Sequence, residues 1–160
     1  MNRRNILNVT AMSMVGLALL SGIAIGQGEH KLTPPQDIKW GPAPPSLPSG
    51  AQAAVLYGDP GKEGMFVFRL KTPKDYHIAP HIHPKPEIVT VISGTVRLGM
   101  GETADHAKAQ VLPAGSLFAM PPGMVHYYFA DEDTVIQLQS TGPWGINYVN
   151  PKDDPRQKTQ

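Results

Sequence analysis

Apolar and polar residues alternate along short stretches of the chain from residue 53 onwards. Alternation with a period of two is typical of β-strands that bury one face. The stretches end at residues that favour turns, mostly glycine, proline or aspartate. The candidate strands are residues 53–59, 64–72, 87–93, 95–101, 109–121, 125–131 and 134–140. Because no stretch beyond residue 26 has the 3.6-residue period of an amphipathic helix, we predict an all-β fold, an antiparallel sandwich or barrel.

The N-terminus has the three-part pattern of a secretory signal over residues 1–26. A basic start precedes the uncharged apolar residues 11–25, and small residues precede a cleavage site between Gly26 and Gln27. The alternative is an uncleaved membrane anchor, although the apolar stretch is shorter than the roughly 20 residues of a membrane span. We expect an exported protein, periplasmic or secreted, and the export route, Sec or twin-arginine, stays open.

The remaining chain has the length of one domain with a short segment at each end. Residues 27–52 are rich in proline and are expected to form an extended arm. The strand pattern places the β-domain at residues 53–150 and leaves residues 151–160 as a polar tail.

Charge and cysteine content narrow the function. Without the signal, the chain has 12 basic and 13 acidic residues. A protein with this charge lacks the excess of positive charge that nucleic-acid binding needs. We expect no nucleic-acid partner and no stable membrane insertion after cleavage. The chain has no cysteine, so any metal site must use nitrogen and oxygen ligands.

The stretch HIHPKPE, which begins at His81, carries three side chains that can ligate a metal. On a strand, His81 and His83 point to the same side, with Cα atoms roughly 7 Å apart. Glu87 would lie about 13 Å further along a straight strand, too far to share an ion. Pro84 and Pro86 lack the N–H group needed inside a sheet. We therefore expect a turn between His83 and Glu87 that directs the carboxylate back toward the histidines.

A fourth ligand is available in the stretch PPGMVHYYF. Pro122 and Gly123 suit the central positions of a type II turn, and His126 begins the strand that follows. Three imidazoles and one carboxylate suit manganese, iron, nickel, copper or zinc, and they leave two corners of an octahedron open.

These residues resemble the two sequence motifs of the cupins, a family of small β-barrel proteins. The first motif is matched by His81, His83, Glu87 and Gly94, and the second by Gly115, Pro121, Gly123 and His126. The chain departs from the family pattern at two turn positions. Asp75 stands where the first motif opens with glycine, and Ala130 stands where the second ends in asparagine. Neither position is a ligand in the family.

The resemblance implies a fold and a class of function. The fold is an antiparallel double-sheet jelly-roll β-barrel, and the metal ligands are His81, His83, Glu87 and His126. Manganese or iron is favoured, and zinc, nickel and copper remain compatible. The resemblance also implies a homodimer. We expect a metal-dependent enzyme, a dioxygenase, decarboxylase, lyase or isomerase, that acts on a small oxygen-rich or aromatic molecule.

Two further residues are candidates for catalysis. Tyr128 has the same strand parity as His126, and Gln137 is expected to point into the barrel. No obvious catalytic acid or base accompanies the ligands. The alternative function is therefore a non-catalytic, metal-containing module that binds or senses a small ligand.

Overall fold

The computed structural model describes residues 30–157. The chain divides into two units, residues 1–30 and 31–160, and the fold described below belongs to the second. The expected signal at residues 1–26 and its cleavage point lie outside the described residues, as do the first residues of the expected arm and the last of the tail.

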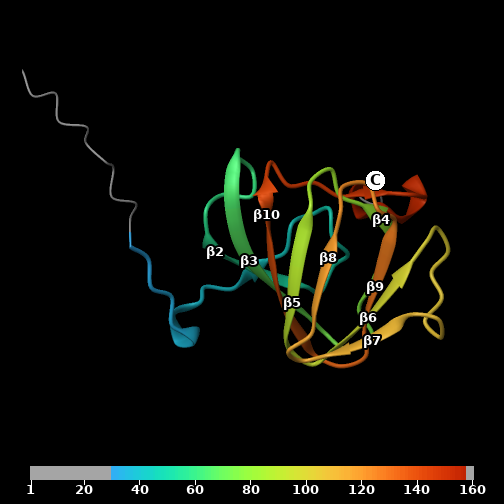
Figure 1. Ribbon diagram of the computed structural model, residues 1–160, viewed down its shortest axis with the longest axis horizontal. Coiled ribbons are helices and arrows are strands. Elements are labelled where there is room, and N and C mark those ends of the chain that lie inside the picture. Colours follow the sequence, from blue (N-terminus) through green and yellow to red (C-terminus); the bar gives the residue numbers. More distant parts are fainter. Residues whose placement is uncertain (1–29, 158–160) are drawn as a thin grey trace, which may run out of the picture. The chain divides into compact units, whose positions relative to one another are not determined.

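The described residues form two antiparallel sheets that pack as a sandwich (Figure 1). The first sheet has the order β1-β2-β3-β10-β5-β8, and the second has the order β11-β4-β9-β6-β7. The strands are β1 (Gly41–Pro42), β2 (Gln52–Tyr57), β3 (Gly64–Thr72), β4 (His77–Ile82), β5 (Glu87–Ser93), β6 (Thr95–Met100), β7 (Gln110–Pro113), β8 (Leu117–Met120), β9 (His126–Ala130), β10 (Thr134–Gly142) and β11 (Asn147–Tyr148). The predicted all-β, double-sheet jelly roll is confirmed.

The alternation of side chains explains how the two sheets pack. In β3, Phe66, Phe68 and Leu70 are buried, whereas the residues between them face outward. Strand β10 pairs with β3 along its full length and presents Ile136 and Leu138 to the same interior. Burying these apolar faces between the sheets is the main stabilising contribution in such a sandwich.

The short strands β1 and β11 were not expected from the sequence. Each has only two residues, too few to show an alternating pattern. Strand β1 pairs with β2, and β11 pairs with β4 beside His81. Both strands therefore add to sheet edges that longer strands have already formed.

The segment between β1 and β2 packs against the sandwich. Leu47 is buried, and two tyrosine hydroxyl groups hold the backbone on either side of it. Tyr148 donates to the carbonyl of Ser46 over 2.8 Å, and Tyr76 donates to that of Pro48 over 2.6 Å. These bonds fix Leu47 against the interior.

Asp75 occupies the glycine position of the first motif with a left-handed backbone, at φ 63°. Aspartate tolerates this conformation better than most residues other than glycine. Its N–H donates to the carbonyl of Ala130, the other position at which the chain departs from the family pattern. This hydrogen bond thus joins the two positions at which the chain departs from the family pattern.

In the described part of the chain, the remaining regular structure consists of three short 3₁₀ helices. They are η1 (Pro35–Asp37), η2 (Pro151–Asp153) and η3 (Pro155–Gln157). Within residues 30–157, no helix has the length and apolar character required to cross a membrane.

Candidate metal centre

The four predicted ligands come from both sheets of the sandwich. His81 lies in β4 directly opposite His126, the first residue of β9. His83 follows the end of β4, and Glu87 begins β5 in the other sheet. All four side chains are buried, with exposed fractions of 3% or 4%.

The three histidines form a compact cluster. One ring nitrogen from each lies within 4.8 Å of the other two, and the ring centroids are 4.3, 4.9 and 5.3 Å apart. Glu87 Oε1 is 3.4 Å from His83 Nε2. Two atoms that ligate one ion at about 2.1 Å lie roughly 3.0 to 3.4 Å apart at neighbouring coordination positions. The spacing of the three imidazole nitrogens therefore suits a single metal ion, and the Glu87 carboxylate lies next to His83 at the side of this cluster.

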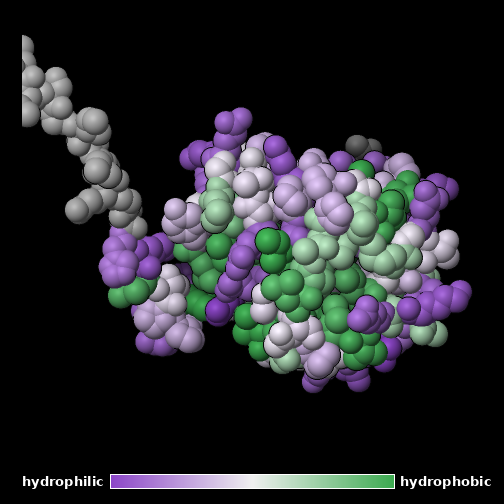
Figure 2. Space-filling model, in the orientation of Figure 1, coloured by the Kyte–Doolittle hydropathy of each residue, from purple (hydrophilic) through white to green (hydrophobic). Residues whose placement is uncertain are grey.

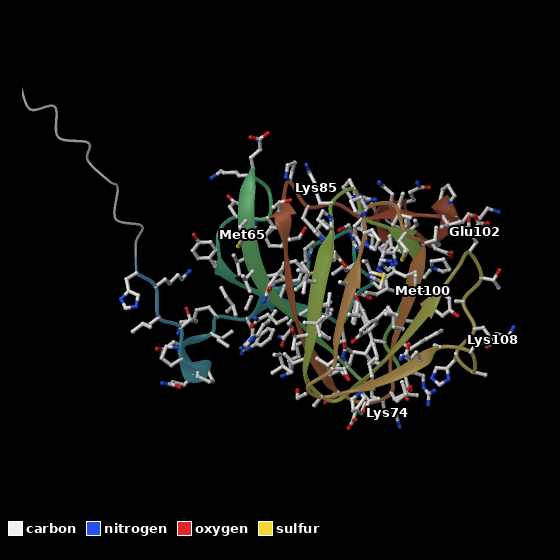
Figure 3. The ribbon with its side chains drawn as sticks, in the orientation of Figure 1. Met65, Lys74, Lys85, Met100, Glu102 and Lys108 are labelled. Carbon is white, nitrogen blue, oxygen red and sulfur yellow. The ribbon has the colours of Figure 1, made fainter. Side chains whose placement is uncertain are left out.

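The corner between His83 and Glu87 forms where the sequence predicted a turn. Strand β4 ends at Ile82, and the chain crosses to the other sheet before β5 begins. Figure 3 shows Lys85, which belongs to this corner, at the end of the sandwich opposite to Lys74. The proline-containing corner thus brings the carboxylate to the histidines.

The expected turn before His126 is also present. The N–H of Met124 donates to the carbonyl of Pro121 over 3.3 Å, and Gly123 has a φ of 75°. The N–H of Gly123 donates to the carbonyl of His83 over 2.9 Å. The same turn therefore precedes β9, which begins at His126, and is tied to the backbone of His83 just after β4.

Hydrogen bonds select the tautomer of each histidine. The Nδ1 atoms of His81, His83 and His126 lie 2.7, 2.7 and 3.0 Å from backbone carbonyl oxygens. A carbonyl only accepts, so each Nδ1 carries the proton and donates it. Each Nε2 is then an unprotonated nitrogen with a lone pair, which is the form that ligates metals.

Burial keeps the rings neutral. It lowers the pKa of His83 to about 4 and the pKa of His81 further, with a smaller contribution from the neighbouring histidines. Burial also lowers the pKa of His126. Because protons compete with metal ions for the same nitrogens, these lowered pKa values leave all three nitrogens available at neutral pH.

Glu87 has the opposite shift. Its pKa is raised to about 7, because the effect of burial exceeds the opposing effect of the hydrogen bond from Trp144. A buried carboxylate without a positive partner is costly, and a cation at the cluster would offset this cost. The donor set, three neutral imidazoles and one carboxylate, therefore fits a divalent transition metal.

The cluster lies at the wall of a narrow cavity inside the sandwich. The cavity has a volume of about 40 Å³, enough for a few water molecules. Its other lining is almost entirely apolar and comprises Leu47, Phe68, Leu70, Ile78, Val89, Leu98, Phe118, Tyr128, Ile136, Leu138, Trp144 and Ile146. The cluster of candidate metal ligands is thus the main polar feature of a cavity that is otherwise apolar.

Tyr128 lines this cavity, on the same strand as His126. Its hydroxyl group is 2.9 Å from Thr72 Oγ1 and shares a hydrogen bond with it. Burial raises its pKa to about 12, so the hydroxyl stays protonated at neutral pH. Tyr128 can therefore shape the cavity as a neutral group, with its hydroxyl already engaged.

The expectation that Gln137 points into the barrel is wrong. Its neighbours Ile136 and Leu138 line the cavity, so Gln137 lies on the opposite face of β10. There its Oε1 accepts a hydrogen bond from Arg69 Nε over 3.1 Å. The apolar side chains of β10 therefore face the cavity, and its polar side chain Gln137 faces outward.

Trp144 was not among the residues predicted from the sequence to belong to the site. Its indole N–H donates to Glu87 Oε1 over 2.8 Å, and its ring stacks on His83 with centroids 5.3 Å apart. The next residue, Gly145, accepts the Nδ1–H of His83. The only available signal was a large aromatic residue between proline and glycine, just after the last long strand.

The other histidines lie apart from the cluster. His77 stacks on Phe129, and His106 Nε2 lies 2.9 Å from Asp131 Oδ1. His30 is exposed. None of these was predicted to be a ligand.

A family model for cupins matches residues 60–141, just over half of the chain. Two plant relatives match shorter stretches. Germin-like protein subfamily 2 member 1 of Arabidopsis thaliana is 43% identical over 49 residues, 30% of this chain and 22% of that protein. Germin-like protein 9-3 of Oryza sativa subsp. japonica is 37% identical over 51 residues, 31% of this chain and 24% of that protein. The chain thus spans about a quarter of the length of these relatives.

Solved structures with the same fold have low sequence identity to the chain. The polyketide cyclase RemF of Streptomyces resistomycificus has a TM-score of 0.62 at 16% identity, covering 82% of this chain and 94% of its own. An acetylacetone dioxygenase of Acinetobacter johnsonii has a TM-score of 0.58 at 16% identity, covering 79% and 81%. The DMSP lyase DddQ of Ruegeria pomeroyi DSS-3 has a TM-score of 0.57 at 16% identity, covering 72% and 62%.

The family match, both motifs and the double-sheet fold agree. The chain belongs to the cupin family.

Proposed function

We propose that this cupin is a metal-dependent enzyme that acts on a small oxygen-bearing or aromatic molecule. The observation that carries the proposal is the buried cluster of His81, His83 and His126, with Glu87 beside it, at the wall of an apolar cavity. Its reaction is that of a dioxygenase, decarboxylase, lyase or isomerase. Among these, a dioxygenase-like oxidoreductase or a lyase is the preferred class.

We propose manganese or iron as the native metal. Nitrogen and oxygen donors suit both, and they also accept zinc, nickel and copper. The carboxylate of Glu87 adds a hard oxygen donor to the three imidazoles, which favours manganese and iron over metals that prefer soft ligands. A metal bound here would supply Lewis acidity to a substrate oxygen or a binding position for dioxygen.

The residues of the chain would perform three tasks around that ion. The three histidines hold their Nε2 lone pairs ready, because backbone carbonyls fix their tautomers. Glu87 contributes the negative charge that partly neutralises a divalent cation. The apolar wall excludes bulk water, which strengthens electrostatic interactions within the cavity.

The cavity limits the substrate class. Its small volume and its aliphatic and aromatic lining favour a compact molecule whose polar atoms gather at one end. That end would face the metal cluster, and the apolar part would contact the opposite wall. The cyclase, dioxygenase and lyase that share this fold support small-molecule chemistry as the common theme.

Oxygen-uptake and product assays test the proposal. The chain is loaded with Mn(II) or Fe(II), offered small β-diketones, phenols and hydroxy acids, and monitored with an oxygen electrode and by NMR. We expect turnover of at least one class that disappears when the metal is removed with a chelator. Binding of such molecules without any turnover would favour the alternative function.

The alternative is a non-catalytic module that binds or senses a small ligand at the metal. One observation favours it: apart from the four predicted ligands, Tyr128 is the only titratable residue among the described residues that line the cavity. An enzyme built this way would rely on the metal and its ligands for all proton transfer. Turnover in the assay above would exclude this alternative.

We also propose that the protein is exported and that its mature chain begins at Gln27. The support is the signal pattern of residues 1–26. Mass spectrometry of the protein recovered from its own host tests this proposal. An intact N-terminal segment on the recovered protein would contradict it.

A further inference from the structure

We propose that Trp144 is a positioning residue of the metal centre, which holds the Glu87 carboxylate through its indole N–H and supports the ring of His83. This inference rests on the metal-dependent function proposed above. It assigns a role to a residue that lies outside both cupin motifs and outside the family match at residues 60–141.

The hydrogen bond is directed at the carboxylate oxygen that lies beside His83. Trp144 Nε1–H donates to Glu87 Oε1 over 2.8 Å, and the same Oε1 lies 3.4 Å from His83 Nε2. A carboxylate oxygen has two lone-pair sites, so Oε1 can accept the indole N–H and still face an ion. The contact therefore fixes the carboxylate without using up its capacity as a ligand.

The chemical type of the donor also matters. An indole donates one hydrogen bond and carries no charge. A lysine or arginine at this place would neutralise Glu87 and weaken its attraction for a cation. Trp144 instead orients the carboxylate and leaves its negative charge for the metal.

The ring of Trp144 supports a second ligand. It stacks on His83 at an interplanar angle of 26°, and its other neighbour, Phe68, meets it edge-on with centroids 5.6 Å apart. The carbonyl of Gly145 accepts the Nδ1–H of His83 over 2.7 Å. Two consecutive residues thus orient two of the four predicted ligands.

The segment that carries Trp144 is anchored on both sides. The backbone N–H of Trp144 donates to the carbonyl of Pro60 over 2.7 Å. Two residues later, the carbonyl of Ile146 accepts a hydrogen bond from Arg156 Nη2 over 3.2 Å. A support fixed in this way limits the movement of Glu87 and His83 before a metal arrives.

The loss of a hydrogen bond to a metal ligand from a neighbouring residue typically lowers metal affinity 10- to 100-fold. The variant Trp144→Phe keeps an aromatic ring beside His83 and removes the N–H. We therefore expect its affinity for Zn(II), measured on the full chain by competition with a chelator, to fall by roughly that factor. Trp40, the only other tryptophan, is the matched control, and Trp40→Phe should keep the affinity within about twofold.

A double-mutant cycle separates positioning from packing. Glu87→Ala removes the acceptor of the indole bond and leaves the three histidines to bind Zn(II) more weakly. If Trp144 acts through Glu87, Trp144→Phe should cost at most about threefold in the Glu87→Ala background. An equal loss in both backgrounds would mean that Trp144 serves packing only and would overturn the proposal.

Fluorescence gives a second readout that does not require a Trp144 variant. In Trp40→Phe, Trp144 is the sole tryptophan, and Zn(II) lacks the open d-shell that quenches nearby fluorophores. We expect a saturable change in its emission with the same midpoint as metal binding. Constant emission during Zn(II) binding would overturn the assignment.

The experiments distinguish a failure of the Trp144 assignment from a failure of the metal centre itself. Wild-type affinity retained in Trp144→Phe would remove only the role of Trp144. An absence of Zn(II), Mn(II) and Fe(II) binding by the wild-type chain would overturn the metal centre and this inference with it.

Discussion

Each histidine of the cluster donates a hydrogen bond from one ring nitrogen to a backbone carbonyl, and its other ring nitrogen faces the cluster. The three residues are His81, His83 and His126. This arrangement fixes the tautomer before any metal binds, and burial keeps the rings unprotonated. Glu87 differs because its burial favours the protonated form. In the metal-free protein, the histidines and the glutamate therefore respond to pH with opposite signs.

We expect the metal-free protein to lose stability as pH falls from about 6.5 to 4.5. The unfolded chain binds protons on these histidines below their ordinary pKa of 6.5, whereas folded His83 does so only near pH 4 and His81 lower still. Within this window, each such histidine lowers the free energy of unfolding by roughly 1 kcal/mol for each unit by which the pH falls. Glu87 opposes them, because its pKa rises on folding from 4.5 to about 7.

Urea unfolding in the presence of a chelator at several pH values measures this balance. The histidines outnumber the glutamate, so the net free energy of unfolding should increase with pH over this range. Glu87→Gln removes the opposing contribution and should steepen the dependence. Stability that is flat or that falls with increasing pH would contradict the neutral state of the histidines.

The ligands could be predicted from sequence because their spacing has a direct geometric meaning. Alternation places His81 and His83 on one side, and two prolines require the corner that returns Glu87. The direction of Gln137 depended instead on which face of β10 met the cavity, and the apolar face did so. Trp144 reaches Glu87 across 57 positions of sequence, a contact that no local pattern records.

The turn from Pro121 to Met124 connects secondary structure to the site. Gly123 has a φ of 75°, and a side chain added there would have no atom within 4 Å. A substitution would therefore act through backbone conformation, without a steric clash. A β-branched residue disfavours positive φ, typically by 1–2 kcal/mol or more.

We expect Gly123→Val to shift His126 and to weaken metal binding at least about tenfold. Gly123→Asn is the matched control, because asparagine tolerates the left-handed conformation and should retain most of the affinity. Isothermal titration with Zn(II) compares both variants with the wild type. Equal affinities of the valine variant and the wild type would show that the turn does not place His126.

Among the strands, β3 and β5 have the bounds that alternation predicted. The predicted stretch 109–121 divides into β7 and β8, which belong to different sheets. Gly115 lies between them, and the chain crosses there from one sheet to the other. A two-residue strand such as β11 forms because it pairs with a longer neighbouring strand. Its own two residues are too few to predict it from the sequence.

The outer face of the first sheet has a hydrophobic surface, which Figure 2 shows over β5 and β8. Ile88 and Leu117 on these strands are exposed at 44% and 61%. Apolar side chains gathered on one face are typical of protein interfaces. This surface is therefore the expected interface if the chain forms the homodimer that the family resemblance implied.

We expect light scattering to give twice the mass of one chain. Leu117→Lys, which places a charge on this surface, should shift the protein toward the monomer. Val111→Lys is the control, because Val111 is 49% exposed on β7 of the other sheet. A monomeric wild-type protein would refute the dimer, and dissociation by the control alone would place the interface elsewhere.

Metal content tests the central claim most directly. The wild-type chain and His83→Ala are purified in parallel from a host supplied with manganese and iron, and their metal is measured by elemental analysis. We predict about one metal ion per wild-type chain and at least a tenfold lower content in His83→Ala. Circular dichroism should show the same β-sheet spectrum for both proteins. Equal metal content in two folded proteins would contradict a metal centre at His81, His83, Glu87 and His126.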